Sequence, residues 1–199
     1  MYIKHKKEKR ALDHYNKNIN YFDSNKYLNA AMSIETFNNI IKCFDIDLNN
    51  KTILDFGTGT GETTLYILKN YNINNITAID YSENRIKQLQ KYTKKYNNLQ
   101  CINMDVNYYI EEYNNYNKYD IIFAFEIIEH LENPREVISK LKNFLKDGGK
   151  IIGTIPLQNK PNDVHLSAFK SIDEVEKMLS VKVTDKFTLR FGNQLVFYY

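Results

Sequence analysis

Short apolar runs alternate with amphipathic segments along most of this chain. The runs are rich in β-branched and aromatic residues, which is typical of strands buried on both faces of a sheet. The segments between them repeat apolar residues at helical spacing, as at Ile86 and Leu89. They predict helices at residues 82–96 and 135–145, and the second is followed by a predicted turn at residues 147–149. This alternation predicts an α/β fold around a mostly parallel sheet. The predicted strands span residues 52–56, 74–80, 99–104, 119–125 and 150–155.

The two ends of the chain extend this pattern. Residues 30–44 carry apolar side chains at a helical period, which predicts a helix packed on the sheet. Residues 181–190 and 194–199 alternate apolar and polar side chains around Phe191, Gly192 and Asn193, which is a hairpin signal. The hairpin predicts a sixth and a seventh strand that are antiparallel.

Residues 51–70 join a strand to a helix through three glycines, Gly57, Gly59 and Gly61. Glycine adopts positive φ without strain, and it lets a ligand approach where a Cβ would block it. The N-terminus of the following helix presents unpaired N–H groups and a partial positive charge. The stretch therefore predicts a nucleotide-binding corner.

The spacing of the glycines argues against a dinucleotide. A dinucleotide fingerprint has glycine at the first, third and sixth positions of the turn, whereas Glu62 takes the sixth position here. Its carboxylate would repel a pyrophosphate. The pattern instead resembles motif I of the class I S-adenosylmethionine-dependent methyltransferases, in which the loop passes under a methionine moiety. The resemblance implies that Asp55 helps to hold the ligand's ammonium group. It implies further cofactor contacts from Phe56, Gly57, Thr58, Gly59 and Gly61.

Two aspartates follow the next strands of the predicted sheet. Asp80 lies where an acidic residue can accept hydrogen bonds from both ribose hydroxyls, and Tyr81 could lie against the adenine. Asp105 matches the family position that binds the exocyclic amine of adenine, while the backbone N–H of Val106 would meet the ring. The alternative for each aspartate is a helix N-cap, a role for which Ser82 competes with Asp80.

The run EIIEHLENP at residues 126–134 follows the central strand. It resembles the post-strand motif of a methyltransferase branch that includes the ubiquinone-biosynthesis O-methyltransferases. This resemblance places Phe125 and Glu126 near the methionine end of the cofactor. Glu126 and Glu129 are spaced to share one face of a helical turn, and His130 is adjacent to them. Glu126 and His130 are therefore the predicted catalytic residues.

Three roles remain open for His130. As a general base, its imidazole could take the proton of a substrate hydroxyl. As a metal ligand, it would act with Glu126, Glu129 and His165. That set resembles the metal-binding residues of the small-RNA 3′-terminal 2′-O-methyltransferases, and it suits Mg²⁺ or Mn²⁺. The third role is structural, in which the histidine orients the loop and does no chemistry.

Composition narrows the class of protein only slightly. The 199 residues suffice for one α/β domain, and a net charge of +3 does not by itself indicate nucleic acid. Cys43 and Cys101 are isolated and read as reduced thiols, and no apolar stretch approaches the length of a membrane span. We expect a cytoplasmic protein without a membrane partner. We also expect a helical lid segment at residues 1–50 and a methyltransferase domain at residues 51–199.

The resemblance implies a Rossmann-like three-layer sandwich with a seven-stranded, mostly parallel sheet whose last strand is antiparallel. It implies S-adenosyl-L-methionine as cofactor, S-adenosyl-L-homocysteine as product, and a divalent metal if His130 is a ligand. The expected reaction is O-methylation of a small molecule or a sugar. One alternative is metal-dependent RNA 2′-O-methylation, and another is a cofactor-binding protein without turnover. The sequence predicts no oligomeric state.

Overall fold

The computed structural model describes residues 34–113, 116–159, 165–180, 182–189 and 192–199. Residues 1–33, which make up most of the predicted lid segment, lie outside the described residues. The lid and the division of the chain into two segments therefore stay predictions. The rest of the predicted lid contains helix α2 (Ile34–Cys43). This helix buries Phe37, Ile40 and Ile41 against the sheet, as its apolar period predicts.

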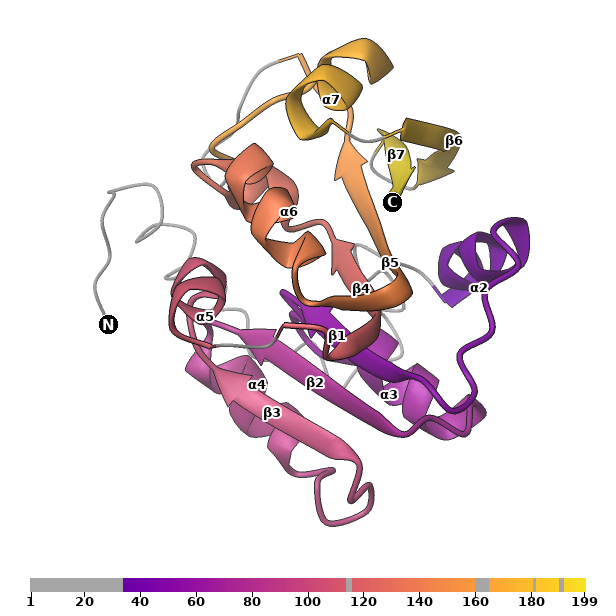
Figure 1. The fold of residues 1–199 in the computed structure, drawn as a ribbon, viewed down its shortest axis with the longest axis vertical. Helices are drawn as coiled ribbons and strands as arrows, with labels where there is room; N and C mark the ends of the chain where they lie inside the picture. Colours follow the sequence, from indigo (N-terminus) through magenta and orange to yellow (C-terminus); the bar gives the residue numbers. More distant parts are fainter. Residues whose placement is uncertain (1–33, 114–115, 160–164, 181, 190–191) are drawn as a thin grey trace.

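The sheet has seven strands in the order β3-β2-β1-β4-β5-β7-β6, which confirms the predicted strand number (Figure 1). Strands β1 to β5 run parallel to one another, and β7 runs antiparallel to both of its neighbours. Strand β6 consequently points in the same direction as β5. The strands are β1 (Thr52–Phe56), β2 (Asn75–Asp80), β3 (Leu99–Asn103), β4 (Tyr119–Phe125), β5 (Leu145–Pro156), β6 (Lys182–Leu189) and β7 (Gly192–Tyr198).

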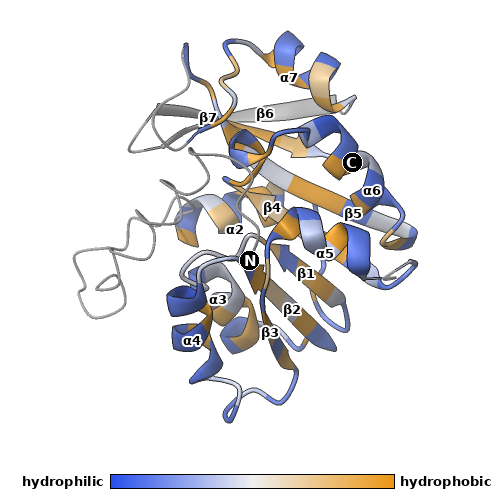
Figure 2. Cartoon of the chain, turned by 90° about the vertical axis from the view of Figure 1, so that its left-hand side faces the viewer, coloured by the Kyte–Doolittle hydropathy of each residue, from blue (hydrophilic) through white to orange (hydrophobic). Residues whose placement is uncertain are grey.

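Helices cover both faces of the sheet, which gives the predicted three-layer sandwich (Figure 2). One layer contains α2, α3 (Glu62–Asn70) and α4 (Glu83–Gln90), and the other contains α5 (Val106–Glu112), α6 (Pro134–Lys142) and α7 (Ile172–Leu179). Strand β4 shows why both layers are needed. Its Ile122 and Ala124 pack on the α5–α7 side, while Phe123 and Phe125 pack on the α2–α4 side. An apolar strand of this kind is stable only when both faces are covered.

Several boundaries differ from the sequence expectation. The helix expected at residues 135–145 ends at Lys142, and β5 begins early, at Leu145. The reason is that Leu145 already pairs with Tyr119, and a register shift follows before Ile121. Gly148, expected in a turn before the strand, lies inside that irregular pairing with a φ of +73°. The helix expected from residue 82 to residue 96 is shorter and ends at Gln90.

The topology decides where a ligand can bind. The chain leaves β1 toward β2 on one side and returns through β4 on the other side, so the carboxyl ends of β1 and β4 form a switch point. Open α/β sheets bind ligands in the crevice at such a point. The glycine turn follows β1, and residues 126–130 follow β4, so both predicted motifs meet there. None of the described helices is long and apolar enough to cross a membrane.

Candidate functional site

The glycine turn is bonded to the end of the neighbouring strand β2. The backbone N–H groups of Gly57 and Thr58 both donate to the carbonyl oxygen of Ile79, at 3.0 and 2.8 Å. The N–H of Gly59 donates to Oδ2 of Asp80 at 2.9 Å. All three glycines of the turn have positive φ, a backbone conformation that residues other than glycine rarely adopt. The turn is thus a preformed loop that Asp80 holds in place.

Asp80 connects three parts of the site. Its side chain is 4% exposed, and its Oδ1 accepts the N–H of Ser82 at 2.8 Å, where α4 begins. Ser82 occupies the N-cap position without a side-chain cap bond. Burial raises the pKa of the Asp80 carboxyl, while the charge of Arg85 and the two N–H donors oppose that rise. A buried carboxylate with polar partners at this edge fits the predicted contact to ribose hydroxyls.

Asp55 supports the turn from the strand below. It is 3% exposed and accepts hydrogen bonds from the hydroxyls of Thr58, at 2.7 Å, and Thr64. Burial raises the pKa of its carboxyl, although both hydroxyls lower it. Thr64 is not among the predicted site residues, and its position in the first turn of α3 was the available signal. The contact of Asp55 with an ammonium group stays a prediction.

Packing accounts for two of the three glycines in the turn. A Cβ built on Gly57 would lie 2.9 Å from the side chain of Ile127, which follows β4. A Cβ on Gly61 would lie 2.7 Å from Leu89 in α4. Real Cβ atoms do not approach other atoms so closely, so these glycines let the loop after β4 and helix α4 pack on the turn. At Gly59 a Cβ would meet, among the described residues beyond its chain neighbours, only Nη1 of Arg85, at 3.3 Å, and the expected approach of a ligand to the turn stays a prediction.

Asp105 caps a helix, as its alternative reading predicted. Its Oδ1 accepts the N–H of Asn107 at 2.8 Å, at the start of α5. Asp80 and Asp105 nevertheless share one edge of the sheet, because the side-chain amide of Asn103 donates to the carbonyl oxygens of Asp80 and Tyr81. The predicted contact of Asp105 with adenine stays a prediction, because the helix cap neither supports it nor excludes it. The remaining adenine candidates, Tyr81 and Val106, are half-buried and buried respectively.

Glu126 begins the loop after β4 in a strained backbone conformation, with a φ of +51°. Its N–H donates to the carbonyl and hydroxyl oxygens of Thr154, each at 3.2 Å. Its carboxylate is hydrogen-bonded by the side chains of Thr154 and Gln194, yet burial raises its pKa to about 7. Oε1 of Glu126 is buried and has no hydrogen-bond partner among the described residues. No local pattern pointed to Thr154 or Gln194, which come from β5 and β7.

Glu129, His130 and His165 form a compact cluster beside this carboxylate. Glu129 is 1% exposed, and its Oε1 lies 3.8 Å from Nε2 of His130. The rings of His130 and His165 are nearly perpendicular, with centroids 4.8 Å apart. Burial, and then the charge of Glu126, raises the pKa of Glu129 well above its usual range. Burial lowers the pKa of His165, which favours the neutral imidazole that metals bind.

Backbone hydrogen bonds bring His165 to the cluster. The N–H groups of Leu166 and Ser167 donate to the carbonyl oxygen of Glu129, at 2.8 and 3.0 Å. The side-chain amide of Gln158 contacts Nδ1 of His165 and fixes the ring from the other side. These contacts join the chain after β5 to the short 3₁₀ turn Ile128–His130.

Three of the four predicted metal ligands have donor atoms within 4.8 Å of one another. They are Glu129, His130 and His165. Glu126, the fourth predicted ligand, is not part of this group, and the side chains of Thr154 and Gln194 hydrogen-bond its carboxylate. The set of four ligands stays a prediction. Oε2 of Glu129 is buried without a hydrogen-bond partner among the described residues, so a cation would fit there.

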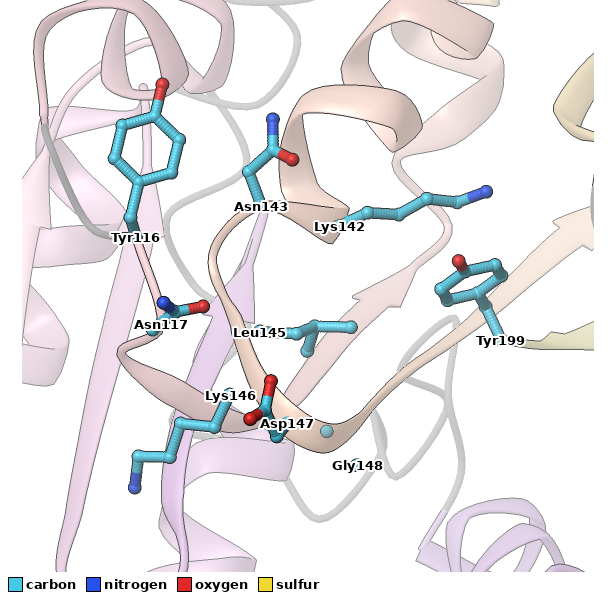
Figure 3. A pocket seen from close by; sticks show the side chains of 10 residues that line it. Tyr116, Asn117, Lys142, Asn143, Leu145, Lys146, Asp147, Gly148 and Tyr199 are labelled. Carbon is cyan, nitrogen blue, oxygen red and sulfur yellow. The ribbon is translucent and has the colours of Figure 1, made fainter.

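A separate hollow lies where β4 and β5 begin, at the end of these strands opposite to the switch point. It is shallow, has a volume of about 520 Å³ and is lined by residues such as Tyr116, Asn117 and Asp147 (Figure 3). The ammonium group of Lys142 extends over the ring of Tyr199, 3.8 Å from its centroid. None of the predicted site residues lines this hollow. The side-chain geometry at the switch point is therefore the better guide to function.

Comparison with known proteins agrees with this geometry. Residues 54–151 match the family model described as "Methyltransferase domain". Over 120 residues, the chain is 36% identical to a ubiquinone biosynthesis O-methyltransferase of Rickettsia bellii, covering 58% of this chain and 46% of that protein. Over 128 residues, it is 29% identical to N-methyltransferase 4 of Papaver somniferum, covering 63% of this chain and 35% of that protein. The chain thus spans less than half the length of these curated relatives.

Solved structures share the fold. One example is the Burkholderia thailandensis 1,6-didemethyltoxoflavin-N1-methyltransferase, solved with bound 1,6-didemethyltoxoflavin and S-adenosylhomocysteine. It has a TM-score of 0.70 and 14% sequence identity, and the match covers 100% of this chain and 91% of that chain. At this identity the likeness concerns the fold alone.

Proposed function

Since the chain belongs to the class I S-adenosylmethionine-dependent methyltransferases, we propose that it methylates a hydroxyl oxygen of a small molecule or a sugar. Its relatives include both O- and N-methyltransferases, so the acceptor atom is part of the proposal. One observation carries it. The glycine turn that Asp80 holds and the loop of Glu126 and His130 meet at the switch point, with Gly57 packed on Ile127.

The residues at the switch point fit the cofactor in three places. The methionine half would lie on the turn formed by Asp55, Phe56, Gly57, Thr58, Gly59 and Gly61, with Phe125 and Glu126 near its sulfur. Asp80 would accept hydrogen bonds from the ribose, beside Tyr81. Asp105 and the N–H of Val106 would contact the adenine. Oε1 of Glu126 supports this fit, because this buried carboxylate oxygen has no hydrogen-bond partner in the described part of the chain and lies where a cationic group would lie.

The cofactor supplies an already activated methyl group when it is bound, so much of the rate would come from positioning the acceptor. His130 would accept the proton that the acceptor hydroxyl loses as its oxygen is methylated. Its ring is partly exposed beside Glu129, so it is accessible to an acceptor and can pass the proton on.

Calorimetry and a product assay test the proposal. We expect wild-type protein to bind S-adenosylmethionine and S-adenosylhomocysteine but not NAD⁺. With a panel of catechols, sugars and amines, S-adenosylhomocysteine release should be fastest for a hydroxyl acceptor. His130→Gln should abolish the release while leaving cofactor affinity unchanged. Binding of NAD⁺ alone would overturn the proposal, and preferential methylation of amines would overturn its choice of oxygen.

A divalent metal is supported by a separate observation, the grouping of Glu129, His130 and His165. In this second candidate, an ion such as Mg²⁺ or Mn²⁺ would lower the pKa of the attacking hydroxyl. Such an ion would also coordinate a second, neighbouring hydroxyl. The 2′,3′-diol at the 3′ end of an RNA offers two adjacent hydroxyl groups of this kind. Metal-dependent RNA 2′-O-methylation is therefore the second function that we propose to test.

Mn²⁺ binding to protein freed of metal by a chelator separates the two candidates. We expect one Mn²⁺ per chain, a large loss of affinity in His165→Ala, and no change in Glu132→Gln, which removes a nearby exposed carboxylate. Full methyl transfer in excess chelator would reject the metal. If an RNA is the acceptor, its affinity should fall steeply as salt rises.

A further inference from the structure

Arg85 lies over the glycine turn, although it is not among the predicted site residues. It belongs to the first turn of α4, just after the segment from Asp80 to Ser82. Its Nη1 lies 3.3 Å from the point where a Cβ on Gly59 would be, and among the described residues other than the chain neighbours of Gly59 no other heavy atom comes within 4 Å of that point. The side chain is half-buried. Arg85 therefore folds inward from its helix and covers the turn.

The guanidinium is also close to the carboxylate assigned to the ribose. Its positive charge acts directly on Asp80 and lowers the pKa of that carboxyl. A second basic residue of α4, Lys87, lies on the exposed side of the helix and serves as a comparison. Lys87, two positions further on, points to solvent and pairs with Glu83 at 2.6 Å.

Gly59 is the one glycine of the turn whose missing Cβ does not make room for an apolar side chain of the protein. The space beside it is shared by the Asp80 carboxylate, the Gly59 N–H and the Arg85 guanidinium. A planar guanidinium stacks on flat aromatic groups and donates hydrogen bonds in a fixed geometry. An adenosine held by Asp80 would bring a ribose and an aromatic base to this space.

We propose that Arg85 is a binding residue for the adenosine half of the cofactor, with its guanidinium against the nucleoside that Asp80 holds. This inference rests on the proposed function. It assigns a residue of α4 to the site in addition to the strand ends and the glycine turn. The competing explanation is that Arg85 only balances the buried charge of Asp80 and touches no ligand.

Two ligands and three variants test the assignment by calorimetry. The ligands are S-adenosylhomocysteine and 5′-methylthioadenosine, which keeps the adenosine and lacks the amino-acid group. Arg85→Met keeps an unbranched apolar stem and removes the charge and the plane, whereas Arg85→Lys keeps the stem and the charge but removes the plane. Lys87→Met is the matched control on the exposed side of the same helix.

We expect Arg85→Met to weaken both ligands by a similar factor, about tenfold for a partly desolvated cation–π contact. Arg85→Lys should restore part of the affinity, and Lys87→Met should change nothing. If Arg85→Met binds both ligands as tightly as the wild type, the inference is overturned. This holds even if the free variant melts at a lower temperature, because a loss of stability alone shows no ligand contact. A loss confined to S-adenosylhomocysteine would also overturn the inference, because the contact would then lie on the amino-acid half. Failure of the wild type to bind either ligand would instead overturn the proposed function.

Discussion

The backbone N–H of Leu166 donates a hydrogen bond to the carbonyl oxygen of Glu129 at 2.8 Å. This bond joins the segment after β5 to the turn after β4. It is the reason why His165 lies beside His130, with ring centroids 4.8 Å apart. The same turn contacts the glycine loop through Ile127 and Gly57. The candidate cofactor and acceptor regions are therefore one packed unit.

Asp80→Ala should weaken S-adenosylmethionine binding sharply. The variant removes the carboxylate that we assign to the ribose hydroxyls. Hydrogen bonds to charged groups contribute about 1.5–3 kcal/mol each, which corresponds to roughly a 10- to 100-fold loss of affinity. Calorimetry measures the loss. Asp47→Ala is the control, because Asp47 is a surface aspartate bonded to Asn49. Unchanged affinity in Asp80→Ala would remove Asp80 from the ribose role.

Asp105→Asn separates the two roles of Asp105. Asparagine caps helices about as well as aspartate, so the melting temperature of the free protein should not change. An asparagine in this place accepts hydrogen bonds less strongly than a carboxylate, so adenine binding should weaken. Asp105→Ala should lose the cap as well, at about 1 kcal/mol of unfolding free energy. If Asp105→Asn binds the cofactor like the wild type, Asp105 is a cap and nothing more.

Gly57→Ala should destabilise the fold more than Gly148→Ala does. Both glycines have positive φ, at +83° and +73°, so an alanine at either position is strained by about 1–2 kcal/mol. At Gly148 a Cβ would meet no heavy atom within 4 Å, whereas at Gly57 it would meet Ile127 at 2.9 Å. The clash should cost about another 1–3 kcal/mol. Denaturant unfolding measures both values.

Adding Ile127→Ala to Gly57→Ala provides a second check on this contact. The smaller side chain removes the atoms that the new Cβ would meet, so the double variant should recover part of the stability lost through the clash. Strictly additive effects of the two substitutions would show that Gly57 and Ile127 do not press on each other.

The stability of the protein should fall as pH rises from about 4.5 to about 7. Glu126 has an ordinary pKa of 4.5 and a folded-state pKa of about 7, so in this window the folded chain keeps a proton that the unfolded chain has released. A raised carboxyl pKa therefore favours folding below the window, and this contribution disappears as pH passes the folded-state value. Melting temperatures at pH 5 and pH 7.5, measured with chelator, test the effect.

Glu126→Gln is the comparison for this pH effect, because glutamine keeps the shape of the side chain and does not titrate. Its melting temperature should fall less between the two pH values than that of the wild type. The lowered pKa of His165 acts in the opposite direction, but both proteins retain that histidine. Equal falls in the two proteins would show that Glu126 does not hold the proton.

The sequence by itself determined the sheet and the edge at which the site lies. Apolar runs such as the one at Tyr119–Phe125 require cover on both faces, and helical periods between them supply the cover. Parallel strands then bring their carboxyl ends to one edge, so Gly57, Asp80, Asp105 and Glu126 had to lie near one another. These conclusions follow from local periodicity and from connection rules, which act over short stretches of chain.

Only the tertiary structure decided which side chains meet. Gln194 reaches Glu126 because β7 pairs with β5, and no local pattern specifies that pairing partner. Arg85 lies over Gly59, and Ile127 over Gly57, because helix and loop packing set those distances. The Glu126 carboxylate is hydrogen-bonded from β5 and β7, whereas the donor atoms of Glu129, His130 and His165 lie together. Contacts between residues far apart in the chain depend on how the layers pack, which spacing along the sequence does not encode.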